Sequence, residues 1–412
     1  MKKTIIATIL CCFALALAAQ PYSLETLVEH GVENATAIRQ QLLDELSTRS
    51  SLTSSFHNFL PQASVSYSYS ESDVSASYTS SLSISKSVSL QDSDWYEYRR
   101  QYIYLAMAEL SLEALRKQIA CTVVSQYLGV IEAERTGEIL TAQYAIEQKT
   151  HEQTQILFDT DKRSLLDLKQ SEINLIDARI AMENQAIVLA TLRQNLFNLL
   201  NLEDMGWALA DPGLDLEPLA LSWQKPLAVR LEEEGIDADR ISLRESFRRF
   251  MPNLTLSASW SYGASGPDAG DPIDSDLLDD SYSLGLTAKY NLLNFLTHGQ
   301  THRRQKWAMR RRMLGLEDML QQKRLEFEQQ VADWNHLRSM HDLYIQKLEL
   351  AADNHEMAQE KYRLGMLSFL DTERVRLDYF QAQITVNRSH FNLLRQREEL
   401  NLLLSRPILG RW

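Results

Sequence analysis

The sequence predicts an α+β fold in which each chain supplies four transmembrane β-strands to a barrel and forms very long coiled-coil helices with the rest. Three observations support this prediction. Four short runs alternate a small hydroxyl residue with an apolar one, the stretches after them hold few helix-breaking residues, and the same order of segments occurs twice in the 412 residues. Together these features indicate something other than an ordinary globular domain.

The four alternating runs cover about residues 62–71, 78–90, 253–262 and 281–290. A period of two places alternate side chains on opposite faces of a strand. One face is apolar and aromatic, and the other carries small hydroxyls with little charge, which is typical of a barrel strand that faces lipid outside and water inside. Each run has about the ten residues that a tilted strand needs to cross a bilayer.

These faces give two sets of candidate residues. The predicted lipid-facing residues are Val65, Tyr67, Leu82, Ile84, Leu256, Trp260, Leu284 and Leu286. The predicted lumen-facing residues are Ser64, Ser66, Ser83, Ser85, Ser257, Ser259 and Thr287.

Two stretches, from about Trp95 to Phe158 and from about Gln300 to Arg363, contain neither a proline nor a glycine pair. A helix of that length rises roughly 95 Å. Apolar residues recur at spacings of three, four and seven, which indicates antiparallel coiled-coil packing. One stripe comprises Leu316, Leu320, Phe327, Val331, Trp334 and Leu337, and another comprises Leu377, Phe380, Ile384, Phe391 and Leu394.

The chain reads as an internal duplication. Phe59-Leu60-Pro61-Gln62 precedes the first strand pair and Phe250-Met251-Pro252-Asn253 precedes the second. In each, the proline ends a helix and starts a strand. The sequence therefore predicts a first repeat over residues 20–203 with a helical hairpin at 95–203, a connector at 204–226, and a second repeat over 227–412 with a hairpin at 299–405.

The N-terminus is typical of a secretory signal peptide, predicted over residues 1–19. Lys2 and Lys3 precede an apolar stretch, and small residues follow it. Leu10 before Cys11 makes a poor lipidation site, and no other stretch is apolar enough for a spanning helix. An exported chain with membrane strands fits the outer membrane of a Gram-negative bacterium, with a large periplasmic portion.

The net charge and the lack of known catalytic motifs argue against two classes of function, nucleic-acid binding and enzymatic activity. The formal net charge of −13 disfavours nucleic acid as a partner, because a polyanion needs a basic surface. The sequence contains no phosphate-binding glycine loop and no hydrolase or metalloprotease motif, so we expect no enzymatic activity and no cofactor.

The ordered set of these features resembles the TolC-like outer membrane efflux protein family. The resemblance is carried by the duplicated plan, the prolines before each strand pair, the turn Tyr362-x-x-Gly365 followed by Leu370-Asp371, and the junction Asn291-Leu292-Leu293-Asn294. It implies a homotrimer with a twelve-stranded barrel and a periplasmic tunnel of helices. The implied partners are a periplasmic adaptor, an inner-membrane pump and outer membrane lipid.

The resemblance also implies that the helical turns close the channel at its periplasmic tip. The candidate tip residues are Tyr362, Gly365, Asp371 and Arg374, with Phe158, Asp161 and Asp167 at the other turn. The family carries a second aspartate three residues after the first, where this chain has Arg374. Asp161 stands where the second turn has Gly365, so the first turn closes differently or holds a left-handed aspartate. Solvated helix-start charges are the structural alternative for the aspartates.

A trimer also follows from the strand count. Four strands cannot close a barrel, and an open edge in lipid leaves backbone groups unpaired. The alternative to an exit duct is a periplasmic coiled-coil spacer or envelope tether, for which serine-lined membrane strands have no use. The sequence does not separate drug, metal and protein transport.

Three other clusters have two interpretations each. The acidic loop at residues 263–281 could bind a divalent cation, but its spacing matches no EF-hand, so an exposed outer loop is favoured. The basic residues between Arg303 and Arg312 could meet anionic headgroups or form a solvated face. His298 and His302 lie four residues apart but lack a third ligand, so no metal site is expected.

Overall fold

A computed structural model describes residues 23–71, 76–204, 206, 208–211, 213, 222–266, 279–290 and 292–411. The predicted signal peptide and most of the acidic loop lie outside these residues. The chain divides into two compact units. The sheet unit comprises Gln41–Leu112 and Leu227–Gln321, and the hairpin unit comprises Met1–Gln40, Glu113–Pro226 and Gln322–Trp412.

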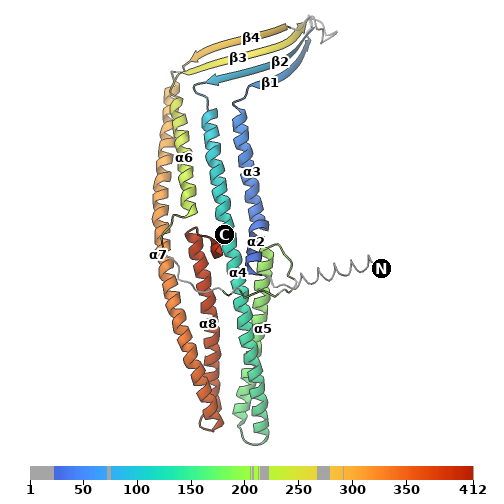
Figure 1. Cartoon of the computed structure of the whole chain (residues 1–412), viewed down its shortest axis with the longest axis vertical. Helices are drawn as coiled ribbons and strands as arrows, with labels where there is room; N and C mark the ends of the chain where they lie inside the picture. Colours follow the sequence, from blue (N-terminus) through green and yellow to red (C-terminus); the bar gives the residue numbers. More distant parts are fainter. Residues whose placement is uncertain are drawn as a thin grey trace, which may run out of the picture. The chain divides into compact units, whose positions relative to one another are not determined.

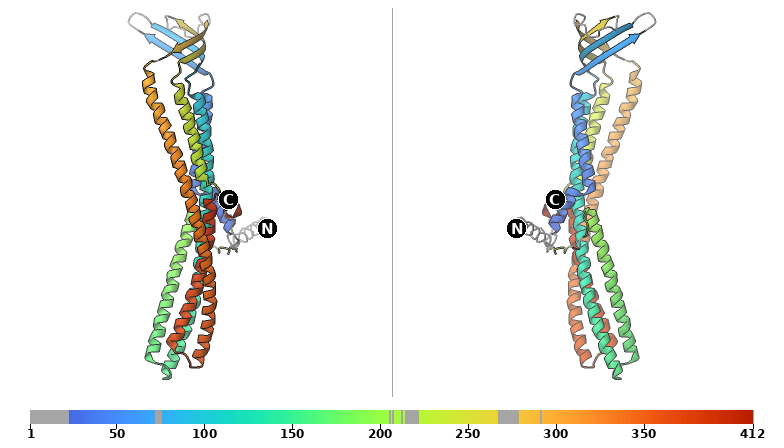
Figure 2. Two further views of the ribbon diagram at one scale, coloured as in Figure 1. Left: turned by 90° about the vertical axis from the view of Figure 1, so that its left-hand side faces the viewer. Right: turned by 90° about the vertical axis from the view of Figure 1, so that its right-hand side faces the viewer.

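The sheet unit contains the four strands, β1 (Gln62–Glu71), β2 (Ala76–Ser89), β3 (Asn253–Gly266) and β4 (Asp279–Lys289). They form one antiparallel sheet in the order β1-β2-β3-β4, which is curved and twisted (Figures 1 and 2). This confirms the predicted four-stranded sheet. β3 runs four residues past the predicted end because Gly266 still pairs with Tyr78 of β2.

Helices lead into and out of each strand pair. In this unit lie most of α3 (Thr36–His57), all of α6 (Leu227–Arg248) and the first parts of α4 (Asp94–Asp159) and α7 (Asn294–Arg363). α7 begins five residues before the predicted hairpin start at 299, since Gly299 does not interrupt it. The long helices have the lengths expected from the absence of prolines.

Aromatic clusters fix the chain where helix becomes strand. Phe59 contacts Trp95 and Tyr98 with ring centroids 6.5 and 6.1 Å apart. In the second half, Phe250 meets His302 at 5.9 Å. The aromatic residue before each proline therefore packs onto the helix that follows the strand pair.

The hairpin unit contains α2 (Leu24–Asn34), α5 (Leu165–Leu199), α8 (Phe369–Leu403), a short 3-10 helix (Ile408–Gly410) and the remaining parts of α4 and α7. Its main core gathers around Tyr127, Leu196 and Phe197 and extends to Phe391 and Leu394. A second cluster joins Trp334 to Leu393 and Leu400.

The predicted apolar stripes are core in part. Phe327, Val331 and Leu337 pack with Trp334, as coiled-coil spacing predicts. Leu377 is 42% exposed, so the stripe on α8 is not buried along its whole length in a single chain. No helix within the described ranges is both long and apolar enough to cross a membrane.

Candidate functional sites: the two-faced sheet and the helical turns

The register of the sheet places the two predicted sets of residues on opposite faces. On one face, Leu82 pairs with Val65 and with Tyr262, while Leu256 pairs with Leu286. Ile84 pairs with Trp260, Trp260 with Tyr282, and Ala258 with Leu284. Tyr67 lies two residues from Val65, so it shares that face.

Serine hydroxyls on the other face bond to one another across the strands. The Oγ–Oγ distances are 2.7 Å for Ser64–Ser83 and 2.8 Å for both Ser66–Ser81 and Ser259–Ser283. Ser85 pairs in register with Ser259, Ser87 with Ser257, and Thr255 with Thr287. Small hydroxyl residues dominate this face, with Gly285 opposite Ser257 and Lys289 opposite Asn253 as exceptions, and each linked hydroxyl keeps a further lone pair for water.

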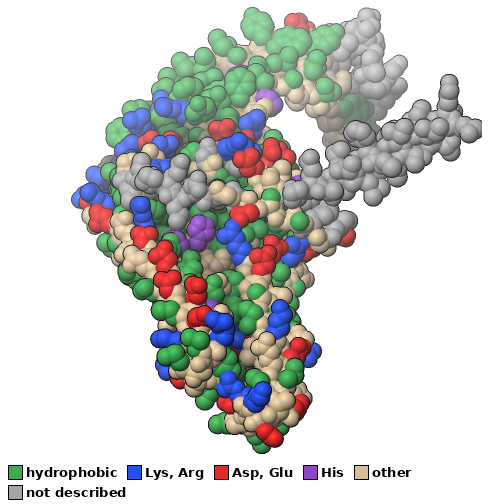
Figure 3. Space-filling model, turned by 60° about the horizontal axis from the view of Figure 1, so that its bottom comes forward, with side chains coloured by type: hydrophobic (Ala, Val, Ile, Leu, Met, Phe, Trp, Pro, Cys, Tyr) green, Lys and Arg blue, Asp and Glu red, His purple; other side chains and the backbone are tan. Residues whose placement is uncertain are grey.

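The apolar face is exposed in a single chain. Val65 is 82% and Leu284 is 76% exposed. Figure 3 shows hydrophobic side chains gathered over the sheet, whereas charged side chains of both signs are scattered over the helices. A continuous apolar surface of this kind marks contact with lipid or another protein.

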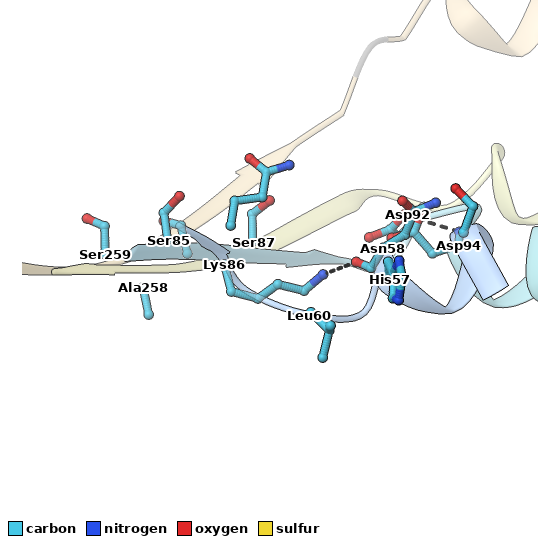
Figure 4. Close-up of a pocket in the computed structure, with 13 residues that line it drawn as sticks. His57, Asn58, Leu60, Ser85, Lys86, Ser87, Asp92, Asp94, Ala258 and Ser259 are labelled. Atoms are coloured by element: carbon cyan, nitrogen blue, oxygen red, sulfur yellow. Dashed lines mark hydrogen bonds between the residues drawn. The ribbon is translucent and has the colours of Figure 1, made fainter. Parts of the chain in front are cut away.

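A polar cavity of about 560 Å³ lies where the sheet meets the helices of its own unit. Ser85, Ser87 and Ser259 point to one side of the sheet and Ala258 to the other (Figure 4). Lys86 interrupts the apolar alternation, and its ammonium donates a hydrogen bond to the Asn58 carbonyl at the end of α3. This lysine therefore ties a strand to the end of a helix, which the alternating pattern did not predict.

The two helical turns of the hairpin unit share one backbone geometry. Lys162 N donates to Leu157 O and Met366 N donates to Lys361 O, each at 2.8 Å, which closes both helices in a Schellman motif. The left-handed residues are Asp161 (φ 54°) and Gly365 (φ 72°). The first turn thus uses a left-handed aspartate, one of the two options that the sequence left open.

Matching caps start the returning helices. Asp167 N donates to Ser164 Oγ at 3.2 Å, and Asp371 N donates to Ser368 Oγ at 3.1 Å. Each serine is an N-cap, and each aspartate lies in the first turn, where a carboxylate suits the helix dipole. The Asp167 carboxylate completes a capping box, and the Asp371 carboxylate accepts from Ser368 Oγ at 2.6 Å, so both carboxylates support the start of a helix. Arg374 is exposed one turn further along α8.

Arg163 links the two turns. Its Nη2 donates to Tyr362 Oη at 2.5 Å, and its guanidinium carbon lies 5.0 Å from the Tyr362 ring centroid and 5.9 Å from that of Phe369. Burial raises the pKa of Tyr362, so its hydroxyl stays protonated. Figures 1 and 2 show both turns at the same end of the hairpin unit. Phe158, the counterpart of Tyr362, accepts at its carbonyl oxygen from Asp161 N at 2.9 Å.

Sequence reasoning missed Arg163. The signal was the mismatch between aligned turns, because Arg163 stands where the second turn has Leu367. It also missed a buried cluster of Glu147, Glu373 and Arg376 in the same unit.

The remaining candidates acquire structural roles or stay untested. His302 Nδ1 lies 2.8 Å from Ser246 Oγ, and Arg312 pairs with Glu232 at 2.6 Å. Among the residues that the structure describes, no group of three or more His, Cys, Asp or Glu side chains could hold a metal ion. Of the acidic loop, Asp279 and Asp280 lie in β4.

One chain thus combines a unit of long helical hairpins with a two-faced four-stranded sheet. Known proteins share this combination. Residues 235–406 match the family model of the outer membrane efflux proteins. The resemblance expected from the sequence is thereby confirmed, and the match is to a family of channels rather than enzymes. Comparison with curated protein sequences gives no match.

Solved structures show the same fold at low sequence identity. A membrane protein from Pseudomonas aeruginosa is 15% identical, with a TM-score of 0.81 over 94% of this chain and 91% of that one. The CmeC outer membrane channel of Campylobacter jejuni is 14% identical, with a TM-score of 0.80 over 92% and 85%. The MtrE outer membrane channel of Neisseria gonorrhoeae, in its open state, is 16% identical, with a TM-score of 0.79 over 94% and 90%.

Proposed function

We propose that this chain is the outer membrane exit duct of a tripartite efflux or type I secretion system. Three copies form a twelve-stranded barrel in the outer membrane of a Gram-negative bacterium, and their helices form a periplasmic tunnel. A periplasmic adaptor and an inner-membrane pump deliver the substrate to it. The match of residues 235–406 to the outer membrane efflux proteins and the likeness to outer membrane channels support this role.

The observation that carries the proposal is the sheet. Its order leaves β1 and β4 as edge strands, and one face is apolar and exposed while the other is lined with serine. In lipid, each unpaired backbone group costs several kcal/mol, so the edges must pair with other strands. Pairing β4 of one copy with β1 of the next satisfies both edges and closes a ring.

The serine face then lines a water-filled lumen. Small hydroxyls neither fill the bore nor bind a cargo tightly, which suits a conduit for varied substrates. The apolar face meets the bilayer, where an isolated charge is costly. The assignments are Val65, Tyr67, Leu82, Ile84, Leu256, Trp260, Leu284 and Leu286 to lipid, and Ser64, Ser66, Ser83, Ser85, Ser257, Ser259 and Thr287 to the lumen.

The helical turns close the periplasmic end when the duct is idle. Copies of the two turns meet near the axis, and the Arg163–Tyr362 contact holds unlike turns together within each chain. The proposed tip residues are Tyr362, Gly365, Asp371, Arg374, Phe158, Asp161 and Asp167. The matching hydrogen bonds of the two turns support an origin of the chain in two tandem repeats, residues 20–203 and 227–412.

Two measurements test this function together. Light scattering of detergent-solubilised protein should give three chains per particle, and the same preparation should form ion-conducting pores in a planar bilayer. A stable monomer or dimer would contradict the barrel. A trimer that inserts but never conducts would favour the alternative, a structural spacer or tether.

A further inference from the structure

The hairpin unit contains a buried charge cluster that no channel function requires. Glu147 of α4 is 1% exposed, and Glu373 and Arg376 of α8 are 4% and 6% exposed. Arg376 Nη2 donates to Glu147 Oε2 at 2.8 Å and also to Glu373 Oε2. Two carboxylate oxygens therefore share one guanidinium nitrogen.

The cluster holds one positive charge for two carboxyl groups. Neutral groups face it from two helices, since Thr150 of α4 accepts from Arg376 at 2.9 Å and Asn174 of α5 donates to Glu373 at 3.2 Å. Tyr362 of α7 also interacts electrostatically with Glu373, and its raised pKa keeps its hydroxyl neutral. From α7, His355 stacks on Tyr379, and both its burial and the charge of Arg376 lower its pKa, so it supplies no second positive charge. Fully ionised, the cluster would bury an uncompensated negative charge, which is strongly unfavourable.

One buried carboxylate oxygen of the cluster lacks a hydrogen-bond partner, which makes it a candidate position for a proton. Among the described residues, Glu147 Oε1 is buried and receives no hydrogen bond. The two carboxyl groups lie against the same guanidinium nitrogen, so their like charges repel in a dry interior, and one of the two is more stable with a proton bound. Glu373 already accepts from Arg376 and Asn174, so Glu147 is the partner that carries the proton.

We propose that Glu147 and Glu373 form a proton-binding site that holds one proton in mildly acidic solution, releases it around neutral pH, and fastens α4 to α8 while the proton is bound. Loss of that proton leaves a buried net negative charge and weakens the packing of α4 against α8. The site requires only the fold of one chain, so its test does not depend on whether the chain forms the proposed duct. In a working duct it would make the helical hairpins respond to periplasmic pH, a consequence that does rest on the proposed function.

The sign of the pH effect follows from burial. Burial, followed by the charge of Glu373, raises the pKa of Glu147 to about 7, whereas the unfolded chain has a value near 4.5. The folded state therefore holds more protons between these values, and its stability falls as pH rises. The contribution is complete below about pH 4.5 and is lost as the pH rises through about 7. Each pH unit in that window changes the unfolding equilibrium by up to about tenfold for one proton.

The test compares Glu147→Gln, which mimics the protonated acid, with the parent chain. Full-length protein in detergent is unfolded with urea at pH 5, 6, 7 and 8. We expect the parent to lose stability relative to the variant as the pH rises, by roughly tenfold or more in the unfolding equilibrium between pH 5 and 7. Glu152→Gln is the matched control, because Glu152 is exposed on the same helix, and it should follow the parent.

Infrared spectroscopy observes the proton directly. The parent should show a protonated-carboxyl band that disappears between pH 6 and 8, and Glu147→Gln should lack it. If Glu147→Gln does not fold, Glu373→Gln leaves one carboxylate for Arg376 and should show the same loss of pH dependence. A parent–variant difference in stability that stays constant from pH 5 to 8, or an infrared band unchanged in both variants, would overturn the proposal.

Discussion

An arginine on the apolar face of the sheet tests which face meets lipid. Leu284 is the sixth of eleven residues in β4, lies opposite Ala258 and is 76% exposed in a single chain. Five residues on each side rise about 17 Å along the strand, or roughly 12 Å of depth at a tilt of about 45°. The side chain therefore lies near the middle of an apolar band about 25 Å tall.

Leu284→Arg should destabilise the inserted barrel by about 2–4 kcal/mol per chain, the cost of arginine near the bilayer midplane. That corresponds to roughly 30- to 900-fold in the folded-to-unfolded ratio. The assay is urea-dependent folding into lipid vesicles, together with the yield of folded trimer on a gel run without heating.

Ser283→Arg is the matched control, since it adds the same side chain at the next position but on the serine face. It loses the 2.8 Å hydrogen bond to Ser259, at a cost of about 1 kcal/mol, and its guanidinium enters water. Equal losses for the two variants would mean that the lipid and lumen faces are wrongly assigned. A larger loss for Ser283→Arg would mean that they are reversed.

Three further predictions concern the turns and the sheet. Arg163→Met removes both the hydrogen bond and the ring contact to Tyr362 and should raise the resting conductance in planar bilayers. Tyr362→Phe keeps the ring and should have a smaller effect. Parental conductance in both variants would mean that the constriction lies elsewhere. Asp371→Asn should lower cation selectivity while sparing the trimer, and unchanged selectivity would leave Asp371 as a helix cap alone. Gly263→Ala would drive a Cβ into a backbone carbonyl of β2 and should abolish the folded trimer. Gly285→Ala meets only a rotatable serine hydroxyl and should have a mild effect. Equal yields of folded trimer for the two variants would refute the close approach of β2 to Gly263.

Local patterns predicted most of the fold, because they report local physics. Alternation with period two identified all four strands, since one register serves a whole face of the sheet. The lack of prolines identified the long helices, and the repeated Phe-x-Pro segments located the helix-to-strand junctions. The mismatch of Asp161 with Gly365 left two options, a different closure or a left-handed aspartate, and the structure has the second.

Contacts between distant residues were not predictable in this way. Arg376 meets Glu147 across 229 positions and Arg163 meets Tyr362 across 199, so no spacing rule connects either pair. Lys86 interrupts an apolar alternation, and its hydrogen bond to the Asn58 carbonyl at the end of α3 explains why a lysine stands there. In each case the sequence shows the charged residue, but the three-dimensional fold is needed to show what balances its charge.

The tie between the turns depends on the differences between the two halves, not on their similarity. The turns share a backbone and a serine-aspartate cap, yet Arg163 is matched by Leu367 and Tyr362 by Phe158. Neither turn could form this contact with a copy of itself, since the first has Phe158 in place of the tyrosine and the second has Leu367 in place of the arginine. A ring of six turns from three chains would then alternate between two unlike kinds, with the Arg163–Tyr362 contact within each chain. A contact between chains must use other groups, and exposed Asp371 and Arg374 on α8 are two charged candidates. Opening can then separate chains while each pair of hairpins stays intact.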